Sequence, residues 1–316
     1  MPRFTIVGIG QALFQQAIPD PPQPGGSPLQ VAVHAHRLAQ ARGGQGLLLS
    51  RLGQDDAGAA ILDYLRQLGI NTAFIQTDPD RPTGQAYLEV DANGHVHRQV
   101  AGYAAWDVLQ FDPDWEDVAH TCQGVYFDTL SQRDAQSRST ILRFLDEARR
   151  AVRLYDANLG WVQELERSIM VRSCQAATIV KLEEAELPVV ASLVGLDATD
   201  PQQAIRGMIG RFNLDMLVLH RGGGRVVLHT ATQQVESQQE AAESAGAARA
   251  AGVESGVGEA VAAAVLAGRA LRLTPAKIAE LASRAGASLV GQAWPMPMLP
   301  DEVVELVRAS PPSAGG

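Results

Sequence analysis

A carboxylate beside closely spaced glycines is the part of this sequence best suited to chemistry. Glu259 directly follows Gly256, Val257 and Gly258, and an alanine-rich run over 260–271 predicts a helix there. Backbone N–H groups at such a helix start can hold an anion such as a phosphate. A carboxylate beside them could take a proton from an attacking hydroxyl. A tight turn, with a first-turn acid favoured by the helix dipole, fits the same residues.

A second set of polar residues follows two apolar runs further along the chain. Lys181, Glu183 and Glu186 come after the first run, and His220 and Gly222 come after the run over 216–219. Two acids three residues apart share a helix face, so they could hold magnesium through water. A solvated acidic helix start explains the two acids equally well.

The elements that carry these residues alternate between strands and helices. Apolar runs predict buried strands over 4–9, 46–50, 125–127, 153–156 and 216–219. Helical spacing predicts helices over 59–68 and 139–152. Pro28, which suits a first turn, and the alanine-rich run predict two more over 28–41 and 260–271, and a further helix is expected over 275–287. This alternation predicts an α/β fold with a mainly parallel sheet flanked by helices on both faces. Ligands bind such sheets at the carboxyl ends of the strands, which is where the polar residues fall.

Two further stretches depart from this alternation. A polar hairpin is expected from strands over 86–90 and 95–100 around a turn at 91–94. His95, His97 and Arg98 lie on it. Because no third ligand is near the two histidines, solvent-facing or lid-interface positions are favoured over a metal site. The polar, alanine-rich stretch 233–252 is expected to be a loose helix or a poorly ordered segment.

Composition limits the functions to be considered. The 316 residues carry a formal net charge of −9, which argues against non-specific nucleic-acid binding. The two cysteines, Cys122 and Cys174, suggest no disulfide framework and fit a cytoplasmic protein. No apolar run is long enough to span a membrane, and the first residues do not resemble a signal peptide. We expect one domain over 1–316.

The order of these motifs resembles that of the PfkB carbohydrate kinases, a ribokinase-like family, and most of all its fructokinase branch. The family has Asp-Thr-x-Gly-Ala-Gly-Asp, whose last residue is the catalytic base. Gly256 and Gly258 match its glycines, and Glu259 stands where the base is. Val253 and Glu254 replace its first two residues. The resemblance implies that Glu259 is the base and that the N–H groups of 256–258 stabilise the transferred phosphoryl group.

The N-terminal motifs carry the same resemblance. The family's Gly-Gly-Ala-Pro-x-Asn-Val-Ala matches Gly25 and Gly26, which would let a sugar lie against the backbone. Gln15 and Gln30 stand where the family has the Asp and Asn that bond sugar hydroxyls. Asp156 begins a segment like the family's Asp-x-Asn-x-Arg, and these five residues are the expected sugar-binding set. Later in that segment, Asn158 is kept and Gly160 replaces the Arg.

The resemblance also implies the cofactors and the organisation of the chain. Lys181, Glu183 and Glu186 match a family segment, Lys-x-Asn-x-x-Glu, that serves magnesium and the nucleotide phosphates, with Glu186 the expected metal residue. His220 and Gly222 match the nucleotide-contacting Thr-x-Gly-x-x-Gly. The implied cofactors are ATP and Mg²⁺. The implied architecture is a single ribokinase-like domain with a β-lid formed by about 11–24 and 84–104.

Three hypotheses on function follow from these observations. The first is an ATP-dependent kinase acting on a sugar hydroxyl. The second is a catalytically inactive relative that binds a sugar or nucleotide or acts as a regulatory subunit, since residues differ from the pattern at the sugar, nucleotide and base positions. The third is a kinase for an unusual substrate, because Gln15 and Gln30 change the pocket. The expected partners are a sugar and a nucleotide, with no nucleic acid or membrane, and a homodimer through the lid stays open.

Overall fold

The computed structural model describes residues 4–17, 21–91, 96–162, 164–237, 256–292 and 298–309. Of the features discussed above, residues 18–20 of the expected lid, residues 92–94 of the predicted turn, His95, the stretch 238–252, Val253 and Glu254 lie outside these ranges. In the described part of the chain, no helix is long and apolar enough to cross a bilayer.

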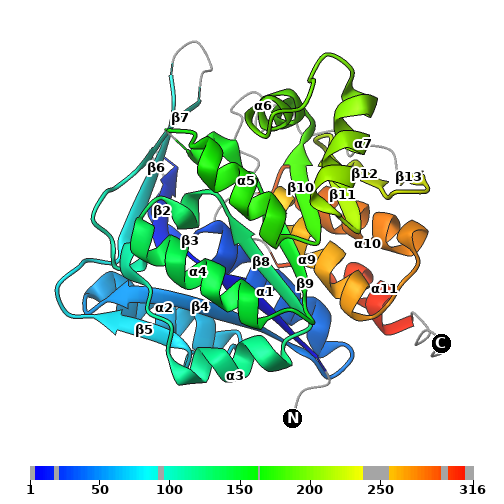
Figure 1. Cartoon of the computed structure of the whole chain (residues 1–316). Coiled ribbons are helices and arrows are strands. Elements are labelled where there is room, and N and C mark those ends of the chain that lie inside the picture. The colour runs from blue at the N-terminus through cyan, green and yellow to red at the C-terminus, as the bar shows by residue number, and fades with distance from the viewer. Residues whose placement is uncertain are drawn as a thin grey trace.

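The molecule is built on a nine-stranded sheet (Figure 1). Its strand order is β13-β12-β11-β10-β9-β8-β1-β4-β5, and all neighbours are parallel except at β12 and β13, which are antiparallel. The strands are β1 (Thr5–Ile9), β4 (Gln45–Gly53), β5 (Ile75–Asp78), β8 (Gly124–Asp128), β9 (Val152–Asp156), β10 (Ile179–Glu183), β11 (Met216–His220), β12 (Val226–His229) and β13 (Gln234–Glu236). The predicted mainly parallel sheet is therefore confirmed.

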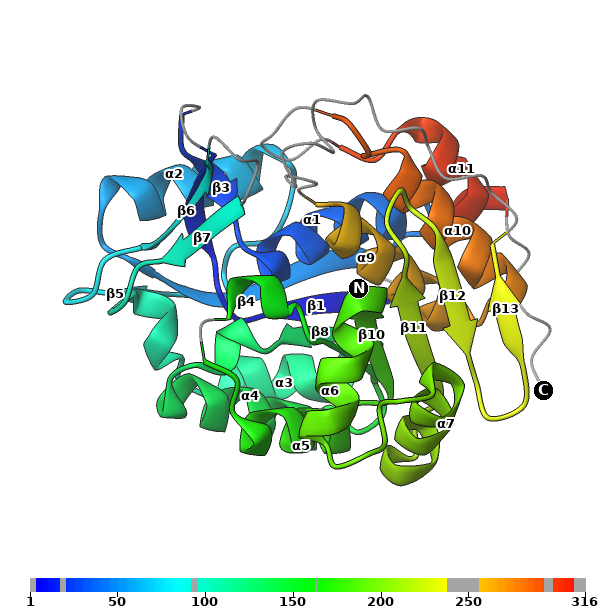
Figure 2. The ribbon, with the colours of Figure 1, turned by 90° about the horizontal axis from the view of Figure 1, so that it is seen from above.

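Helices cover both faces of this sheet, as the view from above shows (Figure 2). One face carries α3 (Pro113–Thr121), α4 (Ala135–Glu147), α5 (Arg167–Ala176), α6 (Leu187–Leu193) and α7 (Pro201–Phe212). The other carries α1 (Ser27–Gln40), α2 (Asp56–Gln67), α9 (Val257–Ala270), α10 (Pro275–Ala287) and α11 (Asp301–Ala309). Short 3-10 turns lie at η1 (Ala105–Val108), η2 (Leu130–Gln132), η3 (Leu159–Trp161) and η4 (Glu184–Glu186).

Both faces of the central strands are apolar because helices bury both. In β8, Val125 and Phe127 pack in the core beneath α3 to α7, whereas Tyr126 between them packs in the core beneath α1, α9 and α10. Leu154 and Tyr155 of β9 divide in the same way. Successive side chains of a strand point to opposite faces, so a strand buried on both sides reads as one continuous apolar run.

A second, four-stranded sheet stands beside the carboxyl end of β1, in the order β3-β2-β6-β7 (Figure 1). Its strands are β2 (Leu13–Ala17), β3 (Gln23–Gly25), β6 (Gly84–Val90) and β7 (Val96–Val100). β2 pairs with β6 in parallel, and each strand has an antiparallel partner on its other side. Segments about 70 residues apart in sequence therefore meet here, which brings Gln15 of β2 opposite Ala86 of β6.

Three local predictions need correction or extension. The helix predicted over 139–152 ends at Glu147, because Ala148 leaves the helical conformation (φ −81°, ψ 39°) and Val152 already pairs with Gly124 as the start of β9. The prediction of a loose segment over 233–252 is wrong for 234–236, which form β13 against β12. Helix α11 was not predicted. It packs Val303 and Val307 into the core beneath α1 and α10.

Candidate active site

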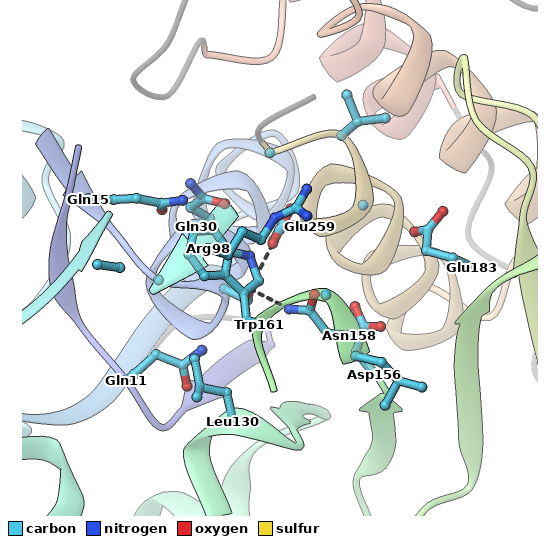
Figure 3. Close-up of a pocket in the computed structure, with 18 of the residues that line it drawn as sticks. Gln11, Gln15, Gln30, Arg98, Leu130, Asp156, Asn158, Trp161, Glu183 and Glu259 are labelled. Carbon is cyan, nitrogen blue, oxygen red and sulfur yellow. Dashed lines mark hydrogen bonds between the residues drawn. The ribbon is translucent and has the colours of Figure 1, made fainter. Parts of the chain in front are cut away.

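A cavity of about 560 Å³ lies between the four-stranded sheet and the carboxyl ends of the parallel strands. It brings together residues from segments that are far apart in sequence, from Gln11 to Glu259. Of the predicted site residues, those that line it are Gln15, Gly26, Gln30, Asp156, Lys181, Glu183, Glu186, His220, Gly256, Val257, Gly258 and Glu259. Figure 3 shows Gln15 and Gln30 toward one end, Glu183 toward the other and Glu259 between them.

Glu259 lies in the first turn of α9, directly after the glycines. Gly256 is the N-cap in the left-handed region (φ 81°, ψ −10°), a conformation that favours glycine. No described side chain caps this helix, so the first backbone N–H groups remain for a ligand. Together with the helix dipole, they give this helix end a partial positive charge that suits an anion, and anion binding here stays a prediction. The Glu259 carboxylate accepts a hydrogen bond from Ser27 Oγ at 2.7 Å.

Lys181 is the centre of a buried charge cluster beside this helix end. Its Nζ lies 3.0 Å from an Asp156 carboxylate oxygen and 3.3 Å from Glu183 Oε1. A Cβ added to Gly258 would meet Lys181 Nζ at 3.2 Å, so any larger residue there would push the ammonium group away by a few tenths of an ångström. The positive charge of Lys181 and the N–H groups of α9 therefore lie together at one place in the cavity.

Burial and mutual contact shift the titration of this cluster. Burial raises the pKa of Asp156 to about 8, although Lys181 opposes this, and Glu186 and Glu259 add to the rise. Burial tends to lower the pKa of Lys181, but the three carboxylates around it outweigh burial and raise it, so the amine stays charged. Burial tends to raise the pKa of Glu183, yet Lys181 and His220 hold it at about 2.

His220 and Glu186 are held by specific hydrogen bonds. His220 Nδ1 lies 2.9 Å from Glu183 Oε1, and its Nε2 is buried without a partner among the described residues. Glu186 accepts from the backbone N–H of Leu159 at 2.6 Å and of Glu183 at 2.9 Å. Glu186 therefore fixes the loops after β9 and β10 against each other. Glu183 and Glu186 therefore belong to a capped turn rather than to a freely solvated helix start.

The other end of the cavity is lined by neutral amides and by residues of the second sheet. Gln11, which also lines it, donates from Nε2 to Asp128 at 2.8 Å. Arg98 of β7 reaches over the ring of Trp161, with 5.7 Å between the guanidinium carbon and the ring centroid. A Cβ added to Gly160 would meet Arg98 at 3.8 Å. The guanidinium thus lies where the side chain of residue 160 would begin.

Two predicted site residues do not line the cavity. A Cβ at Gly25 would meet Gln15 Oε1 at 2.8 Å, so Gly25 makes room for that side chain. Gly222 has φ 72° in the turn between β11 and β12. Asp55, at the end of the loop after β4, is the N-cap of α2 and accepts from the Gly58 N–H at 2.7 Å.

Sequence reasoning missed some residues that line the cavity, above all Ser27, Arg98, Leu130 and Trp161. Ser27 could have been noticed as the polar residue between Gly26 and a proline at a helix start. Arg98 was noticed on the hairpin, but no role in a binding site was assigned to it. Its direction depends on how the hairpin packs on the main sheet, and no local pattern encodes that packing.

Comparison with known proteins relates this architecture to sugar kinases. The chain is 27% identical over 207 residues to a fructokinase from Vibrio alginolyticus, covering 63% of each chain. A probable fructokinase-4 from Arabidopsis thaliana is 26% identical over 206 residues, covering 63% of this chain and 60% of the relative. The aligned region therefore spans less than two thirds of the length of these relatives.

Solved structures match nearly the whole chain. A fructokinase with bound ATP from Xylella fastidiosa aligns with a TM-score of 0.76 at 22% identity, covering 96% of this chain and 98% of the other. A Vibrio cholerae fructokinase with bound fructose, ADP and calcium ion aligns with a TM-score of 0.75 at 20% identity, covering 96% of this chain and 99% of the other. The fold is therefore ribokinase-like, as predicted. The pfkB family carbohydrate kinase model matches residues 22–302, so this chain belongs to the PfkB family of carbohydrate kinases.

Proposed function

We propose that the protein transfers the γ-phosphoryl group of ATP to a hydroxyl group of a sugar, with Glu259 as the general base. The observation that carries this proposal is the Glu259 carboxylate in the cavity, one residue after glycines whose N–H groups open the same helix. Glu259 takes the hydroxyl proton while the sugar oxygen bonds to the γ-phosphorus. The bond from phosphorus to the bridging oxygen breaks, and ADP leaves with that electron pair.

The amide-lined end of the cavity is the proposed sugar site. Gln15, Gln30 and Asn158 line it and can each both donate and accept hydrogen bonds, which suits sugar hydroxyls. We propose that segments 11–24 and 84–104 form a lid over the sugar and that residues 1–316 act as one domain. Figure 3 supports this, since Arg98 of the lid lies on the same side of the cavity as Gln15 and Gln30.

The opposite end is the proposed nucleotide-phosphate site. The N–H groups at 256–258 would stabilise charge on the transferred phosphoryl group, with the Lys181 ammonium beside them. Glu183, Glu186 and His220 complete this end, and Gly222 lies in the adjoining turn. Magnesium supplies charge neutralisation on the nucleotide when bound. Mg²⁺ usually keeps several waters and takes one or two protein carboxylates, so Glu186 and the 41% exposed side chain of Glu183 fit it.

Location and assembly are further parts of this proposal. A kinase that uses ATP belongs in the cytoplasm, and both cysteines are buried and unpaired, as a reducing compartment favours. Pairing of two copies through the lid is proposed as the mode of a homodimer. Light scattering of the purified protein, before and after removal of residues 84–104, would measure it.

Sugar-dependent release of ADP tests the proposed activity. The assay would contain ATP, magnesium and, in turn, fructose, ribose and 2-dehydro-3-deoxygluconate. We expect turnover of at least one sugar by the wild type, and a loss of about 10²-fold or more in Glu259→Gln, which keeps size but cannot accept the proton. If the wild type binds ATP and a sugar but releases no ADP, the proposed kinase activity is wrong, and the protein is an inactive, ligand-binding relative.

A further inference from the structure

One hydroxyl group joins the Glu259 carboxylate to the sugar end of the cavity. Ser27 Oγ donates to Glu259 Oε1 at 2.7 Å, and Asn158 Nδ2 donates to Ser27 Oγ at 2.9 Å (Figure 3). An amide nitrogen only donates, a carboxylate only accepts, and a serine has one proton. These two bonds therefore run from Asn158 to Ser27 and from Ser27 to Glu259. Ser27 also hydrogen-bonds the Tyr126 side chain, whose hydroxyl can donate to the serine oxygen and leave the serine proton for Glu259.

The two donors are themselves held in place by the fold. Ser27 is the first residue of α1, is 5% exposed and follows Gly26 in a glycine conformation (φ 100°). Asn158 is in the left-handed region (φ 44°, ψ 51°), which asparagine tolerates better than most residues. The chain of hydrogen bonds thus ties α9 to α1 and to the loop after β9, three segments that form different walls of the cavity.

We propose that Ser27, oriented by Asn158, is a positioning residue for Glu259. Ser27 occupies Oε1 and leaves Oε2 to take the proton from the sugar hydroxyl. The family pattern has Ala where Ser27 stands and a shorter Asp where Glu259 stands. The additional methylene gives the carboxylate one more rotatable bond, and the additional hydroxyl fixes it again. This inference rests on the proposed kinase function.

The NMR signal of the Glu259 carboxyl group tests this contact without requiring turnover. The δ-carbon signals would be followed in protein with ¹³C-labelled glutamate, and Glu259→Gln would identify the signal by deleting it. Because Ser27→Ala removes the hydrogen bond to Oε1, it should shift the Glu259 δ-carbon signal at constant pH. Identical signals in the wild type and Ser27→Ala overturn the proposal.

Kinetics test the positioning role once a substrate is known. Ser27→Ala should lower kcat about 10- to 100-fold and change the sugar KM by less than about threefold, since a displaced base affects chemistry more than binding. Asn158→Asp should also lower kcat, because an aspartate accepts the serine proton and turns it away from Glu259. Its sugar KM should change as well, since Asn158 lines the proposed sugar site.

A double-mutant cycle separates positioning from a general structural effect. In the Glu259→Asp background the carboxylate is too short for the same contact. Adding Ser27→Ala to that background should therefore lower kcat by less than about twofold further. Ser288→Ala is the matched control. It removes a hydroxyl that donates to the Ala285 carbonyl of α10 and has no other hydrogen-bond partner among the described residues, so it should leave kcat unchanged. Equal losses from Ser27→Ala in both backgrounds overturn the proposal, whereas a wild type without turnover whose Glu259 signal shifts in Ser27→Ala counts against the kinase function alone.

Discussion

Acidification should destabilise this protein through one buried histidine, His34 of α1. The ring is fully buried, and neither nitrogen has a hydrogen-bond partner among the described residues. Burial lowers the pKa of His34 from 6.5 to about 4. A Cβ on Gly256 would lie 3.7 Å from His34 Nε2, so this neutral ring lies directly behind the glycine that opens α9.

The magnitude follows from proton linkage. The unfolded chain binds a proton at His34 near pH 6.5, whereas the folded protein does so only near pH 4. Stability is therefore present above pH 6.5 and is lost as the pH falls toward 4. One pKa unit corresponds to about 1.4 kcal/mol, so the full loss is about 3 kcal/mol, of which about 2 kcal/mol is reached by pH 5.

Urea unfolding at pH 8 and at pH 5 measures this loss. The wild type should lose about 2 kcal/mol more of its free energy of unfolding between these pH values than His34→Leu does. Each variant is compared with itself, so packing changes caused by leucine cancel. The pKa values of His36 and His229 are also lowered by burial, but they act equally in both proteins. His120→Gln, at an exposed ring on α3, is the control and should lose as much free energy of unfolding between the two pH values as the wild type does. If His34→Leu also loses as much free energy as the wild type, the reasoning is wrong.

Three further predictions concern the cavity. Lys181→Met leaves Asp156 and Glu183 without their cation and should lower the free energy of unfolding, measured in urea, by about 3–5 kcal/mol. Adding Asp156→Asn should recover part of this loss, and no recovery would contradict the pairing of Lys181 with Asp156. Arg98→Ala should raise the KM for the sugar more than the KM for ATP, and the reverse order would remove Arg98 from the proposed sugar site. Gly25→Ala should displace the Gln15 side chain, which lies 2.8 Å from the new Cβ, and should weaken sugar binding measured by calorimetry, whereas Gly102→Ala, in open space, should not.

The sheet could be predicted from sequence because its strands are buried on both faces. Continuous apolar runs mark β1, β8 and β11 without any knowledge of their neighbours, and α10 was predicted at its observed bounds. The α4 prediction failed for a related reason. The apolar residue Val152 fits the helical spacing of the preceding residues, but it pairs with Gly124 instead, and only tertiary structure decides between the two.

The site divides in the same way into what local sequence encodes and what it does not. The glycines and Glu259 are contiguous, so their geometry at the start of α9 follows from the chain itself. The Lys181 cluster could be named but its contacts could not, because Asp156 is 25 residues away and meets Lys181 only through the pairing of β9 with β10. Ser27 lies 232 residues from Glu259, and no spacing rule joins them.

The residues that differ from the family pattern and line the cavity lie at positions that are compatible with the proposed site. Gln15 and Gln30 are longer than the residues they replace, yet they line the cavity without filling it. The buried cluster around Lys181 is poor evidence for stability, since apolar residues of similar volume often stabilise a protein more than a buried ion pair does. Charges that cost stability and lie beside a helix N-terminus are better explained by an anionic ligand. The geometry of the cavity therefore favours phosphoryl chemistry over a cavity that has lost its role.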